Sequence, residues 1–217
     1  MIASFIFDMD GTLLDTERLA TWAWSMAAKE MDVSFDHRLL QRMKGASLDQ
    51  AKLIFDAAYH NEPSFEKARL VRDKYFFSRV WEEPHLVLPG VTMVLSFLKS
   101  HHFKIALATS SHREYGQAIL RKTNLACFFD EMVFGEEVKC GKPHPDIFLE
   151  AARRIGTPPA RCAVVEDSTN GVIAGDCGGF FVIGIPNSHP FTRKEKARCD
   201  LLLPSLSSLM PFLETLV

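Results

Sequence analysis

The sequence has little cysteine and no cysteine pair of the kind that binds metals. Its 217 residues include five cysteines, an odd number, and they are scattered without a Cys-x-x-Cys motif. This spacing favours neither a disulfide framework nor a zinc site, because both require cysteines in matched sets. We therefore expect the protein to work in a reducing compartment, and the cytoplasm fits best.

Basic charge and long apolar runs are also missing. Lysine and arginine total 25 against 27 acidic residues, for a formal net charge of −2, so we expect no nucleic-acid partner. The apolar run Ile2 to Phe7 is short and is followed at once by Asp8, so it reads as neither a signal peptide nor a membrane anchor. A Gly-x-Gly-x-x-Gly dinucleotide loop and internal repeats are absent from the sequence.

What the sequence does contain is an alternation of short apolar runs and amphipathic stretches. The apolar runs lack the period of two that marks a half-exposed sheet, so they read as buried strands. Strands alternating with helices predict an α/β fold with a Rossmann-like, three-layer core around a parallel sheet. The predicted strands are Ile2 to Phe7, Lys104 to Ala108, Ala163 to Val165, Phe180 to Ile185 and Leu201 to Leu203, and the predicted helices include Met93 to Ser100, Tyr115 to Thr123, Asp146 to Ile155 and Ser205 to Leu216.

One long segment interrupts this alternation. Residues 16–83 show helical periodicity in several pieces, with breaks near Gly45 and Pro63. We therefore predict a catalytic core formed by residues 1–15 and 84–217, with residues 16–83 inserted after the first strand as a small helical cap.

Polar residues stand where the predicted strands end, which is where ligands bind in parallel sheets. The first ending is Asp8-Met9-Asp10-Gly11-Thr12, in which two carboxylates flank one residue before a glycine that permits a sharp turn. Two like charges this close are costly unless a cation lies between them, and Mg²⁺ prefers such oxygen ligands. An ordinary Asp-Gly turn is the alternative interpretation.

Three further segments carry the same kind of signal. Thr109-Ser110-Ser111 precedes a helix, so it is either an anion site or a plain N-cap. The loop Gly141 to Asp146 presents Lys142 between prolines, as a phosphate ligand or as a solvated side chain. Glu166-Asp167 forms a second acidic pair at a strand end, which suits a magnesium shell. Their joint occurrence is far more specific than any one of them.

Together these motifs resemble those of the haloacid dehalogenase superfamily, and the likeness spans essentially the whole chain. The stretch from Asp8 to Thr16, together with Gly-Lys-Pro-His-Pro-Asp-Ile-Phe and Val-Val-Glu-Asp-Ser, is similar to subfamily I, in the branch of β-phosphoglucomutase and small sugar-phosphate phosphatases. The resemblance implies a Mg²⁺-dependent phosphatase acting on a small phosphate monoester, most simply a sugar phosphate.

The resemblance also implies roles for individual residues. Asp8 would be the nucleophile that forms an aspartyl-phosphate, and Asp10 the general acid and base. The metal would be held by Asp8, the backbone carbonyl of Asp10, and Asp167, with Glu166 direct or through water. The residues expected to bind phosphate or substrate are Gly11, Thr109, Ser110 through its N–H, Lys142 and, from a cap loop, Lys44.

Two departures argue against a mutase. In β-phosphoglucomutases an arginine and a histidine stand where this chain has Leu48 and Ala20. Losing a bidentate phosphate partner is hard to reconcile with holding a bisphosphorylated intermediate. We therefore rank a phosphatase above a phosphosugar mutase, with a catalytically silent binding protein on the same fold as a third hypothesis. We expect a small phosphorylated metabolite as partner and no membrane contact; the oligomeric state, monomer or weak homodimer, stays open.

Overall fold

The chain folds into two compact units joined by two crossings of the chain. The computed structural model describes residues 1–43, 48–60, 62–187 and 190–217. One unit comprises Met1–Leu14 and Val87–Val217, and the other comprises Asp15–Leu86. The assignment of these parts as catalytic core and cap stays a prediction from the sequence.

The first unit is built on a parallel sheet, as the alternating pattern predicts. Its strand order is β3-β2-β1-β4-β5-β6, and each neighbouring pair runs parallel. Strand β1 therefore lies inside the sheet, between β2 and β4, although both of these strands come much later in the sequence. The strands are β1 Ser4–Phe7, β2 Lys104–Thr109, β3 Glu131–Phe134, β4 Cys162–Glu166, β5 Phe181–Gly184 and β6 Leu201–Leu202.

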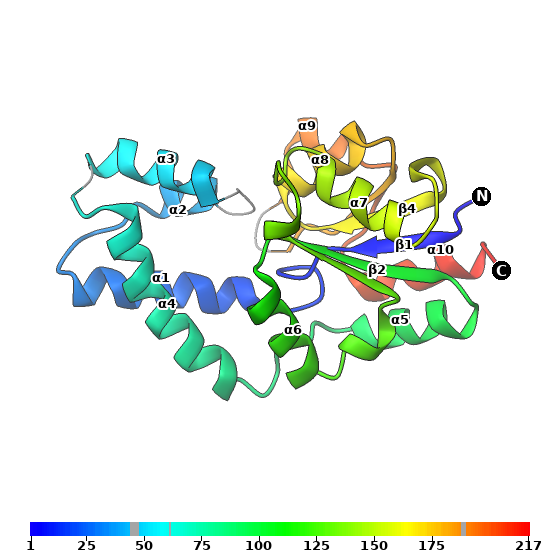
Figure 1. Cartoon of the computed structure of the whole chain (residues 1–217), viewed down its shortest axis with the longest axis horizontal. Helices are drawn as coiled ribbons and strands as arrows, with labels where there is room; N and C mark the ends of the chain where they lie inside the picture. Colours follow the sequence, from blue (N-terminus) through cyan, green and yellow to red (C-terminus); the bar gives the residue numbers. More distant parts are fainter. Residues whose placement is uncertain (44–47, 61, 188–189) are drawn as a thin grey trace. The chain divides into compact units, whose positions relative to one another are not determined.

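The sheet is covered on both faces, which explains why its central strands β1 and β4 show no alternation of apolar and polar residues. Ile6 and Val164 belong to a buried cluster with Phe148 of helix α7, while Phe5, on the opposite face of β1, packs edge-on against Phe103. Figure 1 shows α7 and α8 on one side of the strands and α5 on the other. The helices of this unit are α5 Val91–Ser100, α6 Arg113–Lys122, α7 Asp146–Arg154, α8 Thr169–Cys177, α9 Arg193–Lys196 and α10 Met210–Glu214, with short 3-10 turns η1 Ala126–Phe128, η2 Gly135–Glu137, η3 Pro159–Arg161 and η4 Leu206–Leu209.

Strand β3 corrects the sequence analysis, which placed no strand at that position. It is an edge strand of four residues, and its first two residues, Glu131 and Met132, are only half-buried. An acidic start and a run this short leave no continuous apolar signal. The fold class is unaffected, because β3 extends the same parallel sheet beyond β2.

The second unit is helical over its described residues, as predicted. Helices α1 and α4 pack along each other, and a buried aromatic cluster joins α1, α3 and α4. Trp24 lies in this cluster, stacked on Phe55 with ring centroids 5.9 Å apart, so it serves packing. The helices are α1 Thr16–Glu30, α2 His37–Met43, α3 Leu48–Tyr59 and α4 Phe65–Glu82. Across the described parts of both units, no helix combines the length and apolarity that a bilayer crossing requires.

The β1 core predicts a large stability cost for truncating Phe5. This ring is completely buried and packs against Phe7 and Phe103. Phe5→Ala should lower the free energy of unfolding by about 3–5 kcal/mol, because it removes apolar burial and leaves a cavity. Urea denaturation would measure this, with Phe5→Leu as the graded control; equal losses in the two variants would contradict a cavity as the cause.

Candidate active site

The carboxyl end of β1 leads directly into a tight turn that carries Asp8 and Asp10. The N–H of Asp8 still donates to the carbonyl of Val165 at 3.1 Å, so Asp8 extends the β1–β4 ladder. The chain then turns: Gly11 has φ 89° and donates its N–H to the Leu14 carbonyl at 2.8 Å. Only glycine adopts this conformation readily, and a Cβ here would lie 2.2 Å from Asp167 Oδ2.

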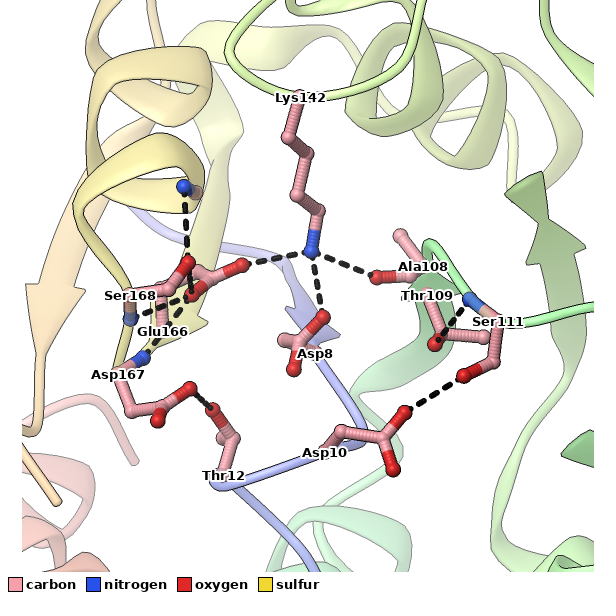
Figure 2. A network of polar contacts seen from close by, with 11 residues as sticks. Asp8, Asp10, Thr12, Ala108, Thr109, Ser111, Lys142, Glu166, Asp167 and Ser168 are labelled. Atoms are coloured by element: carbon pink, nitrogen blue, oxygen red, sulfur yellow. Dashed lines mark hydrogen bonds and ion pairs between the residues drawn. The ribbon is translucent and has the colours of Figure 1, made fainter. Parts of the chain in front are cut away.

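Lys142 lies at the centre of the site (Figure 2). Its Nζ donates to Asp8 Oδ1 at 2.5 Å and to Glu166 Oε1 at 2.6 Å. A third hydrogen bond goes to the Ala108 carbonyl of β2 at 3.1 Å, and the ring of Phe148 lies 4.7 Å away. The lysine is only 2% exposed, so these contacts replace its hydration shell. A solvated loop lysine, the alternative interpretation, is therefore wrong.

Glu166 is completely buried and accepts hydrogen bonds on both oxygens. Its Oε2 receives the N–H groups of Asp167 and Ser168, each at 3.0 Å, and the Ser168 hydroxyl at 2.9 Å. Ser168 Oγ in turn accepts the N–H of Gly171 at 3.0 Å and so caps α8. The carboxylate therefore joins Lys142 to the start of this helix.

Charge in this buried site is unbalanced. Two carboxylates, Asp8 and Glu166, face the single ammonium of Lys142. Burial raises the pKa of the Asp8 carboxyl well above its usual value, against the attraction of Lys142, and the negative charge of Glu166 adds to the rise. Burial alone would lower the pKa of Lys142, but attraction to both carboxylates outweighs it and raises that pKa. The ammonium stays charged, and the site favours further positive charge.

The same edge offers ligands for that charge. Among the residues that the structure describes, Asp8, Glu166 and Asp167 present carboxylate oxygens that all lie within 4.8 Å of one another. Asp167 is oriented by Thr12, whose hydroxyl donates to Oδ1 at 3.2 Å. A set of hard carboxylate oxygens around surplus negative charge fits a divalent cation such as Mg²⁺.

The hydroxyl segment at the end of β2 lies on the other side of Asp8 (Figure 2). Thr109 is 1% exposed, and its Oγ1 accepts the N–H of Ser111 at 3.1 Å. Ser110 between them is exposed. Ser111 reaches back to the β1 turn, where its hydroxyl donates to Asp10 Oδ2 at 2.7 Å.

The predicted site residues divide into those that the structure brings together and one that it does not describe. The residues at the carboxyl edge of the first unit are Asp8, Asp10, Gly11, Thr109, Ser110, Lys142, Glu166 and Asp167. Lys44 lies outside the described residues. Gly11 forms the turn, and its part in phosphate binding stays a prediction.

The sequence analysis assigned no individual role to Ser111 and did not consider Asn187. Asn187 follows β5 and donates from Nδ2 to the Gly11 carbonyl at 2.8 Å, so it ties the β5 end to the Asp8–Asp10 turn. The signal was present, because Asn187 is another polar residue just after a buried strand. A search for polar residues after the end of β5, as was made for the other strands, would have found it.

Comparison with known proteins gives matches over most of the chain. A family model described as haloacid dehalogenase-like hydrolase matches residues 2–179. The chain is 38% identical to the phosphorylated carbohydrates phosphatase of Thermotoga maritima, over 80% of each chain. It is 34% identical to the β-phosphoglucomutase of Bacillus subtilis, over 85% of this chain and 84% of that one. A crystal structure of a putative β-phosphoglucomutase from Thermotoga maritima superposes with a TM-score of 0.78 at 31% identity and covers 100% of both chains.

The packing of α8 against Glu166 predicts that two glycine-to-alanine substitutions in this helix differ in their effect on stability. A Cβ on Gly171 would lie 1.8 Å from Glu166 Oε1, so Gly171→Ala must displace the carboxylate that holds Lys142. We expect a loss of about 1–3 kcal/mol in the free energy of unfolding. Gly175→Ala in the same helix is the matched control, since its Cβ meets Val182 Cγ2 at 3.0 Å and the change also improves helix propensity.

Urea midpoints would measure both substitutions. A Gly171→Ala protein as stable as the Gly175→Ala protein would show that Glu166 has another position available to it.

Proposed function

The chain belongs to the haloacid dehalogenase-like hydrolases, and on that premise we propose that it hydrolyses a small phosphate monoester with Asp8 as the nucleophile. It is a phosphoric monoester hydrolase, in keeping with relatives such as the carbohydrate phosphatase of Thermotoga maritima. A sugar phosphate is the substrate class that we favour. The observation that carries the proposal is the buried triad of Asp8, Lys142 and Glu166 at the carboxyl edge of the sheet.

In the first half of the proposed reaction, the carboxylate of Asp8 attacks phosphorus in line and the bond to the leaving oxygen breaks. Asp10 donates a proton to that oxygen, so the product leaves as an alcohol and the enzyme carries an aspartyl-phosphate. In the second half, Asp10 takes a proton from water as the water oxygen attacks phosphorus. Inorganic phosphate leaves, and both carboxyl groups return to their starting states.

The positively charged and hydrogen-bonding groups are assigned to the phosphoryl oxygens. Lys142 lies within 2.5 Å of the nucleophilic carboxylate, so it is placed to meet the charge that develops on an attached phosphoryl group. Thr109 and the N–H of Ser110 end the adjacent strand β2 and supply neutral donors. Because these groups are held before substrate arrives, little reorganisation is needed during the reaction.

We assign Mg²⁺ to Asp8, Asp167 and the backbone carbonyl of Asp10. Glu166 already accepts Lys142 on Oε1 and three donors on Oε2, so we give it an outer role, through water. When bound, the cation stabilises negative charge on a phosphoryl oxygen as a Lewis acid. The surplus of carboxylate over ammonium in the site supports this assignment.

We propose that residues 16–83 act as a cap that supplies substrate contacts and limits the reaction to small metabolites. Active-site covers of this kind exclude bulk water and strengthen electrostatic interactions. Within this unit, Arg18 pairs with Asp15 at 3.0 Å and with Glu83 at 3.2 Å, which ties its first and last segments together. Asp15 therefore has a structural role here, and we do not include it among the catalytic groups.

A phosphosugar mutase is the second candidate, and the similarity to the Bacillus subtilis β-phosphoglucomutase favours it. The sequence differences at Leu48 and Ala20 weigh against it, because neither side chain can hold a second phosphate. The two candidates differ in product. A phosphatase releases inorganic phosphate from many phosphate esters, whereas a mutase converts β-glucose 1-phosphate to glucose 6-phosphate.

Replacing the nucleophile should separate chemistry from folding. Asp8→Asn keeps the size of the side chain and the Lys142–Glu166 ion pair, so the fold should be retained. We expect phosphate release from a panel of sugar phosphates, nucleotides and glycerol phosphate to fall at least ~1000-fold, because an amide is a poor nucleophile. Circular dichroism would check the fold, and turnover near the wild-type rate would remove Asp8 from the mechanism.

Metal removal should abolish phosphate release, and added Mg²⁺ should restore it.

Asp167→Asn should raise the Mg²⁺ concentration that gives half-maximal activity by roughly 10-fold or more, because it replaces a charged ligand by a neutral one. Asp176→Asn on the same helix–strand unit is the matched control, since Asp176 is 41% exposed and pairs with Arg198. Equal magnesium dependence in the two variants would overturn the assignment of Asp167.

A further inference from the structure

The two carboxylates of the β1 turn have different partners. Asp8 is bound to the ammonium of Lys142, whereas Asp10 accepts a hydrogen bond from a neutral hydroxyl, Ser111 Oγ, at 2.7 Å. Asp10 and Ser111 are 101 positions apart in the sequence and lie at the ends of the neighbouring strands β1 and β2. Figure 2 shows the two side chains pointing toward one another.

The backbone of Ser111 is held on both sides. Its N–H donates to Thr109 Oγ1 at 3.1 Å, and its carbonyl accepts the N–H of Gly135 at 3.1 Å. The loop after β3 approaches so closely that a Cβ on Gly135 would lie 2.4 Å from the Ser110 carbonyl oxygen. Arg113, two residues further on, is tied as well, because it donates its N–H to Glu136 Oε1 at 2.8 Å. The hydroxyl of Ser111 is therefore presented from a fixed segment.

This contact makes the two oxygens of Asp10 unequal. The hydroxyl of Ser111 donates to Oδ2 at 2.7 Å, so this oxygen is tied to the segment that follows β2. The contact limits rotation of the carboxyl group about its last torsion, which is broad in the absence of a partner. The Asp10 carboxyl group is therefore held in one orientation.

We propose that Ser111 is a positioning residue for the general acid: its hydroxyl fixes the orientation of the Asp10 carboxyl group that protonates the leaving oxygen. The proposal rests on the proposed function, because it concerns the step in which Asp10 protonates the leaving oxygen. Ser111 itself takes no part in bond making or breaking. Its removal should therefore slow the reaction in proportion to how much the leaving group needs a proton.

The test is the rate of leaving-group release in the first turnover, measured by rapid mixing for alkyl and aryl phosphates of different leaving-group pKa. Alkyl phosphates such as glycerol phosphate need protonation, while p-nitrophenyl phosphate departs as a stable anion. General acid catalysis accelerates a reaction by about 10²–10⁴-fold. We expect the first-turnover rate of Ser111→Ala with glycerol phosphate to be ~10-fold lower than that of the wild-type protein. With p-nitrophenyl phosphate the first-turnover rate should change less than about 2-fold.

Two further variants keep the test specific. Ser111→Thr retains a hydroxyl and should recover most of the rate with the alkyl substrate. Ser100→Ala, an exposed serine at the end of α5, is the matched control and should leave both rates unchanged. A merely structural role for Ser111 would instead lower the rates with the two substrates by the same factor.

The outcomes separate this proposal from the proposed function. If wild-type protein releases no leaving group from any phosphate ester, the phosphatase assignment itself fails. If wild-type protein turns over and Ser111→Ala shows unchanged rates, or an equal loss with both substrates, the positioning role of Ser111 is overturned. A loss confined to the alkyl substrate and recovered by Ser111→Thr supports it.

Discussion

The interaction on which the site depends is the buried ion pair network of Lys142 with Asp8 and Glu166. Removing an ammonium and two carboxylates from water costs several kcal/mol per ion, and attraction offsets that cost only when hydrogen bonding is nearly complete. Here it is dense: Lys142 has three oxygen partners and Glu166 four donors. Such a network leaves little freedom to the segments that supply its groups. These segments are the ends of β1, β2 and β4, the loop that carries Lys142, and residues 167–168.

The strand order explains why this network can form. With β1 inside the sheet and β2 and β4 as its neighbours, a carboxylate at the end of β1 has both flanking strand ends within reach. Ala108 contributes its carbonyl from β2, and Glu166 its side chain from β4. Room for the carboxylates then requires glycine, at Gly11 beside Asp167 and at Gly171 beside Glu166. The close packing around the charged groups therefore depends on two glycines, Gly11 and Gly171, which have no side chain of their own.

The sequence predicts the parts of this arrangement that depend on local pattern. Apolar runs identified five of the six strands, and strand-end residues such as Asp8 and Glu166 marked the site. Strand β3 was missed because Glu131 and Met132 interrupt the apolar signal at an edge. The hydrogen bonds from Ser111 to Asp10 and from Asn187 to Gly11 depend on which strands are neighbours, and a single sequence does not state the order of a sheet.

The separate partners of the two aspartates give a physical basis for the separate roles that we propose for them. The ammonium of Lys142 opposes the effect of burial on Asp8, because it attracts the charged form that a nucleophile needs. Ser111 instead donates a neutral hydroxyl to Asp10, and this contact orients the carboxyl group. Asp8 and Asp10 are separated by one residue, yet the turn directs the first toward Lys142 and the second toward Ser111. The same residue type at two positions of one turn can therefore perform two steps of a reaction, because strands β2 and β4 and the loop carrying Lys142 supply different neighbours to each.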